Sequence, residues 1–290
     1  MSIKLIINPA AGRGKSKRVS KSIIALLQER RVSFEYVYTN RPREAVDYAR
    51  DAVGRFEKII GMGGDGTSNE VGEGVVGSDA LFGMIPMGSG NDFANENGFP
   101  ANPKAAVDFI LGDGVKKIDV IKVNDRVSLN TAGVGFNGSV SEAVKKIKYL
   151  RGLPVYIWGV VKTALNYKSI PMKMTVGETV IEDDIFMISI CNSKREGGGF
   201  IVAPEALNDD GLFNVTIIRN VSYPKLLMNI GNALTGNLEK LDEVDTLVGD
   251  KISIVSEHPM PLHVDGEVVS LAAKEVTATI MKSSLNIISA

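Results

Sequence analysis

The sequence predicts a two-domain protein. Residues 1–120 should form an α/β domain with a parallel sheet and flanking helices, and residues 121–290 a β-rich, antiparallel, sandwich-like domain. Up to about residue 114, apolar strand patterns alternate with amphipathic helix patterns, as in parallel sheets joined by right-handed crossovers. From residue 115 onward, most apolar segments are short and alternate with polar residues, which is typical of antiparallel strands.

The first domain should contain four strands, each followed by a loop and a helix. The strands are expected at 3–7, 34–38, 56–60 and 81–86, and the helices at 19–27, 42–49, 67–76 and 103–111. In parallel sheets, ligands bind beyond the carboxyl ends of the strands. The loops that follow the strands should therefore lie at one edge and form a nucleotide site: 8–15, 39, 63–69 and 88–92.

The glycine-rich stretch after the third strand is the most informative part of this domain. Its glycines allow a turn whose backbone N–H groups face a ligand, and Thr67 and Glu70 have the spacing of a capping box that starts a helix at Thr67. Together these features predict an anion site, most often for phosphate. Asp65 lies inside the turn and would repel bare phosphate, so the sequence favours a nucleotide that arrives with Mg²⁺.

Two other phosphate-binding motifs are disfavoured. A P-loop would need glycine five residues before Gly14, where this chain has Pro9, which lacks a backbone N–H. The stretch 61–66 also fits G-x-G-x-x-G, but a dinucleotide site needs an acidic residue at the end of the next strand, and 85–88 has none. An NAD-type redox function is therefore disfavoured.

The second domain should be built from alternating strand segments with two helices inserted. The segments are 116–123, 126–131, 172–176, 185–191, 213–218, 251–255 and 275–280. Ser139 and Glu142 have the spacing of a capping box, and Pro154 favours a first helical turn. Helices are therefore expected from residues 139 and 154.

Composition limits the classes of function. The chain carries 33 basic and 34 acidic residues, a net charge of −1, so it offers no bulk basic surface for nucleic acid. A single cysteine, Cys191, excludes an internal disulfide framework. No window approaches the roughly 20 apolar residues of a spanning helix. A cytoplasmic location is expected.

Several motifs together resemble the diacylglycerol kinase catalytic domain that bacterial lipid kinases share with sphingosine and ceramide kinases. They lie at 8–9, 63–70, 88–94, 197–200, 204–206, 209–213 and 263–267. The Gly-Gly-Asp-Gly core is shared with phosphofructokinases and NAD kinases, so the resemblance implies a first domain of their kind. Residues 284–290 could return to this first domain, as the C-terminus does in relatives of this type. The Ser-Gly-Asn-Asp-Phe-Ala block at 89–94 favours the lipid-kinase branch.

The resemblance also implies which residues hold ATP. Positions that bind ATP in the family match Asn8, Pro9, Thr39, Gly63, Gly64, Asp65, Gly66, Thr67, Ser68, Asn69 and Ser89. The family more often has threonine where this chain has Ser89, so the hydroxyl is kept. Asp65 is expected to take part in catalysis as well.

The late acidic motif Asp265-Gly266-Glu267 matches the position of the family's general base. The resemblance implies that one of its carboxylates accepts the proton of the acceptor hydroxyl. We favour Glu267, with Asp265 beside it at the metal or the hydroxyl. The same residues are a strong signal for a tight hairpin turn, and both interpretations can hold together.

The resemblance further implies a structural Mg²⁺ near Asp210, with backbone carbonyls at Leu207 and Leu212. From residue types alone, 209–211 would be interpreted as a turn. Basic and aromatic residues over 145–168 could rest on anionic lipid at the inner membrane surface, although a solvated helix face is the simpler interpretation.

The leading hypothesis is an ATP- and Mg²⁺-dependent lipid kinase that phosphorylates a hydroxyl of diacylglycerol or a similar membrane lipid. A kinase for a soluble acceptor, such as NAD or a sugar, and an ATP-binding sensor without catalysis remain open alternatives. No nucleic-acid partner is expected, and a homodimer is left open.

Overall fold

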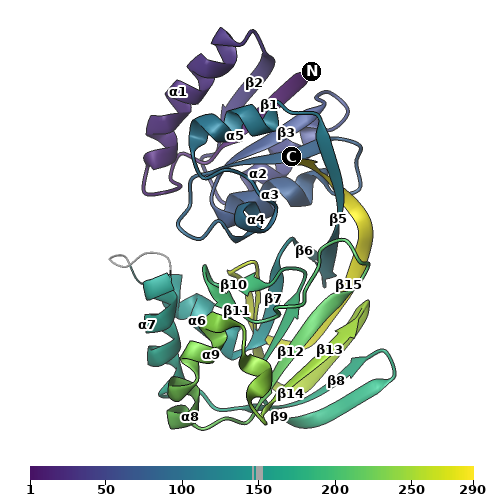
Figure 1. The fold of residues 1–290 in the computed structure, drawn as a ribbon. Coiled ribbons are helices and arrows are strands. Elements are labelled where there is room, and N and C mark those ends of the chain that lie inside the picture. Colours follow the sequence, from purple (N-terminus) through teal and green to yellow (C-terminus); the bar gives the residue numbers. More distant parts are fainter. Residues whose placement is uncertain (146, 148–152) are drawn as a thin grey trace. The chain divides into compact units, whose positions relative to one another are not determined.

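The computed structural model describes residues 1–145, 147 and 153–290, which divide into two compact units (Figure 1). Unit 1 consists of Met1–Ile118 and Ser283–Ala290, and unit 2 consists of Asp119–Lys282. The chain therefore leaves unit 1 once and returns to it with its last residues. The predicted two-domain architecture is confirmed.

Unit 1 is built on strands in the order β2-β1-β3-β4. They are β1 (Ser2–Ile7), β2 (Ser33–Tyr38), β3 (Lys58–Gly63) and β4 (Leu81–Pro86), and each neighbouring pair is parallel. Near the end of β15 (Glu267–Ser289), Ile287 pairs with Phe82 of β4. β3 is buried throughout and β4 over nearly its whole length, as strands covered on both faces are.

Helices flank this sheet, and α2 packs on α3 while α1 packs on α5 (Figure 1). The helices of unit 1 are α1 (Lys15–Glu29), α2 (Glu44–Ala52), α3 (Asp65–Val75), α4 (Asp92–Glu96) and α5 (Pro103–Ile110). Gly74 allows the close approach of α3 to α2, because a Cβ there would lie 2.6 Å from the Cβ of Ala49.

The predicted capping box at Thr67 and Glu70 is wrong. α3 begins two residues earlier, at Asp65. The Oγ1 of Thr67 instead accepts a hydrogen bond from Nδ2 of Asn8 at 3.1 Å. The Glu70 carboxylate accepts two amides at the start of α2, at 3.1 and 3.3 Å. Both side chains therefore tie α3 to neighbouring elements instead of capping it.

Unit 2 is antiparallel, and two of its long strands each pair with the same two shorter strands. β9 (Thr179–Cys191) and β14 (Lys251–Val264) both pair with β7 (Thr131–Gly135) and with β8 (Ile170–Val176). The strands thus enclose a core of buried aliphatic and aromatic side chains. This arrangement agrees with the predicted sandwich-like domain.

Besides β15, which pairs with β14, other strands that lie wholly or partly in unit 2 extend this core or form its edges. They are β5 (Gly114–Val123), β6 (Arg126–Ser128), β10 (Arg195–Glu196), β11 (Phe200–Ile201), β12 (Phe213–Arg219) and β13 (Val244–Gly249). The predicted strand over 126–131 is wrong in one respect, because it divides into β6 and β7. The intervening amides bind a carboxylate of the late acidic turn instead of continuing a ladder.

Helices of unit 2 are α6 (Phe136–Lys145), α7 (Leu153–Ala164), α8 (Tyr223–Met228), α9 (Ile230–Thr235) and the 3₁₀ helix η1 (Leu238–Lys240). The helix expected from residue 139 begins at Phe136, three residues earlier. Within the described part of the chain, no helix is long and apolar enough to cross a membrane. Cys191 is buried in the interior of unit 2.

Candidate functional site

The loop after β1 is fixed against the loop after β3 by Asn8. Its backbone N–H donates to the carbonyl of Met62 at 3.0 Å, and its Nδ2 donates to Oγ1 of Thr67 at 3.1 Å. Its Oδ1 accepts the N–H of Ala10 at 3.1 Å, which turns the chain immediately after the strand. Asn8 therefore joins two of the four loops that the sequence places at this edge.

The loops after β3 and β4 touch backbone to backbone. A Cβ on Gly64 would lie 3.1 Å from Cα of Gly88, and a Cβ on Gly88 would lie 2.7 Å from Cα of Gly64. The N–H of Met87 also donates to the carbonyl of Gly63 at 2.6 Å. Glycine is required at this contact because any side chain would push the two loops apart.

Asp65 stands between these two loops and is largely buried. Its Oδ2 accepts the N–H of Asn91 at 2.8 Å. Among the described residues, none forms a hydrogen bond with its buried Oδ1. Burial, followed by the charge of Asp92, raises the pKa of the Asp65 carboxyl to about 6, against the opposite effect of the amides at 91–93.

Asn91 also belongs to this site, although it was not among the ATP-binding positions predicted from the sequence. It has a left-handed backbone with φ 57°, and its side chain forms hydrogen bonds to both the N–H and the carbonyl of Gly88, at 2.9 and 3.1 Å. This closes the loop after β4 and aims the Asn91 N–H at Asp65. The Gly-Asn-Asp sequence is the signal that could have identified it, because asparagine tolerates this conformation better than most residues.

Other predicted ATP-binding positions differ in exposure. Ser68 and Asn69 are buried in the first turns of α3, whereas Gly66 and Ser89 are exposed. Thr39 is nearly buried, and its N–H donates to the carbonyl of Ile7 at 2.9 Å. The exposed positions are those that a ligand could reach without displacing protein.

A second group of predicted residues lies on the hairpin between β14 and β15. Val264 pairs with Glu267, and the two residues between them have positive φ, 46° for Asp265 and 78° for Gly266. This is a two-residue hairpin turn in which both central residues are left-handed, the conformation that Asp-Gly favours. The hairpin predicted from sequence is confirmed.

The two carboxylates of this turn have different surroundings. Asp265 accepts hydrogen bonds from the Ser128 hydroxyl (2.9 Å) and from the three backbone amides of residues 129–131, at 2.8 to 3.0 Å. Glu267 forms an ion pair with Arg126 at 2.8 Å, and its side chain is 40% exposed. Asp265 is thus held by the protein itself, whereas Glu267 can be reached from solvent.

The predicted Mg²⁺ position lies in a turn before β12. The Oδ1 of Asp210 accepts the N–H of Leu212 at 3.0 Å, and Gly211 has φ 77°. The Gly211 N–H donates to the buried carboxylate of Asp119 at 2.6 Å. Leu207 is 51% exposed. In the described ranges, no cluster of three or more His, Cys, Asp or Glu side chains forms a metal centre.

The basic and aromatic segment predicted over 145–168 is described only in part. Lys146 and residues 148–152 lie outside the described residues. On α7, the Lys162 ammonium lies 4.6 Å from the centre of the exposed Trp158 ring. This pair is a cation–π contact at the surface of unit 2.

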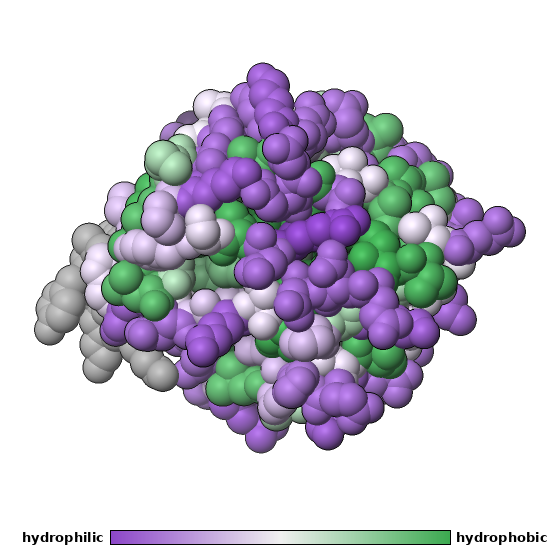
Figure 2. All heavy atoms as spheres, turned by 90° about the horizontal axis from the view of Figure 1, so that it is seen from below, coloured by the Kyte–Doolittle hydropathy of each residue, from purple (hydrophilic) through white to green (hydrophobic). Residues whose placement is uncertain are grey.

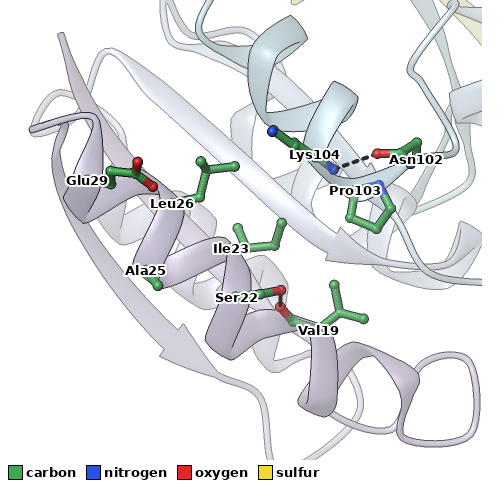
Figure 3. A pocket seen from close by; sticks show the side chains of 9 residues that line it. All are labelled: Val19, Ser22, Ile23, Ala25, Leu26, Glu29, Asn102, Pro103 and Lys104. Atoms are coloured by element: carbon green, nitrogen blue, oxygen red, sulfur yellow. Dashed lines mark hydrogen bonds between the residues drawn. The ribbon is translucent and has the colours of Figure 1, made fainter.

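A groove of about 540 Å³ lies between α1 and the start of α5 (Figure 3). Its lining residues are Val19, Ser22, Ile23, Ala25, Leu26, Glu29, Asn102, Pro103 and Lys104. On the α5 side, Oδ1 of Asn102 accepts the amides of Lys104 and Ala105 and so caps the helix. None of the predicted site residues is among these lining residues, so this groove is separate from the candidate site.

Comparison with known proteins finds two family models that together cover most of the chain. The model of the diacylglycerol kinase catalytic domain matches residues 2–123, and that of the YegS C-terminal NAD kinase beta sandwich-like domain matches residues 130–289. These matches correspond closely to the α/β part and the β-rich part of the chain.

Individual relatives give the same result. The chain is 30% identical over 231 residues to a probable lipid kinase YegS-like protein of Chromohalobacter salexigens, covering 77% of this chain and 74% of that protein. It is 26% identical over 285 residues to a diacylglycerol kinase of Mycobacterium tuberculosis, covering 95% and 92%.

Solved structures show the same fold. A crystal structure of a diacylglycerol kinase from Bacillus anthracis str. Sterne superposes with a TM-score of 0.75 at 22% identity, covering 100% of this chain and 97% of that chain. A second structure from the same organism reaches a TM-score of 0.83 at 25% identity with the same coverage.

Proposed function

Because the chain belongs to the diacylglycerol kinase catalytic-domain family and carries the YegS-type C-terminal domain, we propose that it is an ATP-dependent lipid kinase. It transfers the γ-phosphate of ATP to the hydroxyl of diacylglycerol or a similar membrane lipid. The observation that carries this proposal is that both family models match, one over each part of the chain.

The loops of unit 1 are the proposed ATP site. Asn8, the backbone of 63–69 and Ser89 would hold the phosphates, because backbone amides at a helix start attract anions. The contact between Gly64 and Gly88 supports this proposal, since it fixes two of these loops before ATP binds. Such preorganisation lowers the entropic cost of positioning the γ-phosphate.

Mg²⁺ would accompany ATP, and the environment of Asp65 fits a hard cation. One oxygen of this buried carboxylate has no donor among the described residues, and carboxylate oxygens are ligands that Mg²⁺ prefers. Bound Mg²⁺ would neutralise part of the phosphate charge. We propose a second, structural Mg²⁺ at Asp210, with the carbonyls of Leu207 and Leu212, where the buried Asp119 adds negative charge nearby.

Glu267 is the proposed general base. A base must reach the acceptor hydroxyl with a free lone pair, and four hydrogen bonds already occupy the oxygens of Asp265. Glu267 is partly exposed, and Arg126 holds its side chain in one orientation. Asp265 then shapes the turn from which Glu267 projects.

Acceptor specificity tests the proposal directly. Purified protein is incubated with γ-labelled ATP, Mg²⁺ and, in turn, diacylglycerol, sphingosine, undecaprenol and NAD. Labelled lipid is expected with diacylglycerol or a related lipid, and chelation of Mg²⁺ should abolish it. Labelled NAD alone would favour the kinase with a soluble acceptor, and ATP binding without any labelled product would favour a sensor.

Membrane contact and a homodimer belong to the same proposal. In the view of Figure 2, hydrophilic side chains cover most of the surface and hydrophobic side chains form separate patches. We expect peripheral contact with anionic lipid through the basic and aromatic surface of α7, where Lys162 lies over the exposed Trp158 ring. Cosedimentation with anionic vesicles at low and high salt would measure it. Sedimentation equilibrium would give the oligomeric state.

A further inference from the structure

A buried polar cluster lies directly behind the acidic turn of unit 2. Its members are Glu196 of β10, His263 of β14, Ser189 of β9 and Asn137 of α6. His263 is 1% exposed and the Glu196 side chain 13% exposed, while Ser189 is fully buried. The proposed chemistry uses none of these four residues, so their burial needs another explanation.

The cluster contains an ionised carboxylate in the protein interior. Burial raises the pKa of Glu196, whereas hydrogen bonds from His263, Ser189 and Asn137 lower it and favour the ionised form. The His263 Nε2 lies 2.9 Å from one Glu196 oxygen, and the Ser189 hydroxyl donates to the other at 2.9 Å. Both oxygens of the Glu196 carboxylate are therefore hydrogen-bonded to protein groups.

The hydrogen bonds of His263 define its tautomer. The backbone N–H of Gly266 can only donate, and it points at Nδ1 of His263 at 3.2 Å, so Nδ1 must carry the lone pair. The proton of the neutral ring is then on Nε2, where it is donated to Glu196. Glu196 thus selects the one tautomer that can accept the Gly266 amide.

The hydrogen bond from Gly266 to His263 is the second of two bonds that hold the backbone of the turn in place. The N–H of Asp265 donates to the carbonyl of Thr131 at 2.8 Å, and the N–H of Gly266 donates to His263. Both central amides of the turn are therefore bound to protein groups. Glu267 follows immediately, so the direction in which its side chain leaves the backbone depends on these two bonds.

Gly133 of the neighbouring strand β7 leaves space for the His263 imidazole, and a glycine at this place weakens the strand. A Cβ on Gly133 of β7 would lie 2.2 Å from Nε2 of His263 and 2.1 Å from Nδ2 of Asn137. Glycine inside a strand weakens it, and a buried carboxylate with hydrogen-bonded partners adds little net stability compared with apolar residues of the same volume. Stability alone therefore explains the cluster poorly, whereas orientation of the acidic turn explains it directly.

We propose that Glu196 and His263 are positioning residues for the acidic turn: Glu196 fixes the tautomer of His263, and His263 holds the Gly266 amide so that Glu267 points at the acceptor hydroxyl. The inference rests on the proposed function for the role of Glu267, but the geometry of the turn can be tested without any enzyme activity.

Two substitutions at one position separate the two hydrogen bonds of His263. In His263→Asn, the side-chain oxygen lies where Nδ1 lies and can accept the Gly266 amide, but the contact with Glu196 is lost. In His263→Gln, the amide nitrogen reaches the position of Nε2 and can donate to Glu196, but the acceptor for Gly266 is lost. Both variants remove an aromatic ring from the same buried site, so each serves as the control for the other.

The first measurement is amide hydrogen exchange of peptides that contain 264–267. Exchange of Gly266 is expected to rise about tenfold or more in His263→Gln and to stay near the wild-type rate in His263→Asn. Equal protection in the wild type and His263→Gln would overturn the proposal, whether or not the protein is a kinase.

The second measurement is steady-state kinetics with the acceptor that the panel identifies. His263→Gln should lower kcat by about 10²-fold, as a displaced catalytic group does, with KM for ATP unchanged, and His263→Asn should recover most of kcat. If kcat falls equally in both variants, and in proportion to their lower thermal stability, His263 has only a structural role and the proposal is contradicted. An inactive wild type would count against the kinase function, while the exchange result would still decide the role of His263.

Discussion

At the residue scale, Asp65 combines a cost in stability with a proposed role in binding ATP and Mg²⁺. Burial raises its pKa from 3.8 to about 6, so the folded protein binds a proton between these pH values that the unfolded chain does not. The stability that this proton confers is complete below pH 3.8 and is lost as the pH rises through about 6. Above pH 6 the folded state therefore carries an unfavourable buried charge.

Asp65→Asn should make the protein more stable at neutral pH and inactive. The shift of about two pKa units corresponds to about 3 kcal/mol as an upper limit, so we expect a gain of about 1–3 kcal/mol at pH 7.5 that disappears toward pH 4. Urea unfolding at both pH values measures this gain. Asp79→Asn, at an exposed carboxylate, is the matched control and should change neither stability nor activity. A gain that is equal at both pH values would contradict the assigned cause.

Asp265 and Glu267 should respond differently to loss of charge. Asp265→Asn disturbs hydrogen bonds from one hydroxyl and three backbone amides, so it should lower the free energy of unfolding by about 2–3 kcal/mol. Glu267→Gln breaks only a partly exposed ion pair and should cost less than about 1 kcal/mol while abolishing turnover. Thermal unfolding with parallel activity assays compares them, and the reverse order of stabilities would count against these roles.

The sequence could identify this turn, but not that its two carboxylates have different surroundings and different roles. Asp-Gly between two alternating segments is sufficient to predict the hairpin. The Asp265 oxygens accept hydrogen bonds from backbone amides about 135 residues away in the chain. The local sequence around residue 265 carries no information about such a distant contact. Arg126 and Glu196 were not predicted for the same reason.

At the element scale, strands were easier to predict than helix starts. The predicted segments 81–86 and 213–218 lie within β4 and β12, because apolar periodicity reflects burial directly. The two capping boxes gave wrong helix starts. A capping motif is only a local preference, and the Glu70 carboxylate binds the amides of α2 instead.

The contact between the loops after β3 and β4 leads to a prediction at this scale. Gly88→Ala places a Cβ 2.7 Å from Cα of Gly64, so the loops must separate, and the Kd for ATP should rise about tenfold or more. Isothermal titration of ATP with Mg²⁺ measures it. Gly231→Ala on α9, where a Cβ meets no atom within 4 Å, is the control and should bind ATP normally. Unchanged affinity in Gly88→Ala would remove these loops from the proposed ATP site.

At the scale of the whole molecule, the two-part organisation was predictable because the hydrophobic period changes near residue 115. The acceptor was not, because acceptor choice depends on the shape of a surface rather than on a motif. The proposed ATP-binding residues lie in unit 1, and the proposed base lies in unit 2. The central claim is therefore that one reaction needs residues of both units.

Transfer of labelled phosphate from γ-labelled ATP to diacylglycerol in mixed micelles, with the wild type, Asp65→Asn and Glu267→Gln side by side, tests this claim most directly. We predict Mg²⁺-dependent labelled lipid with the wild type and a loss of at least about 10²-fold in each variant, although both remain folded. Wild-type turnover that persists in either folded variant would contradict the account.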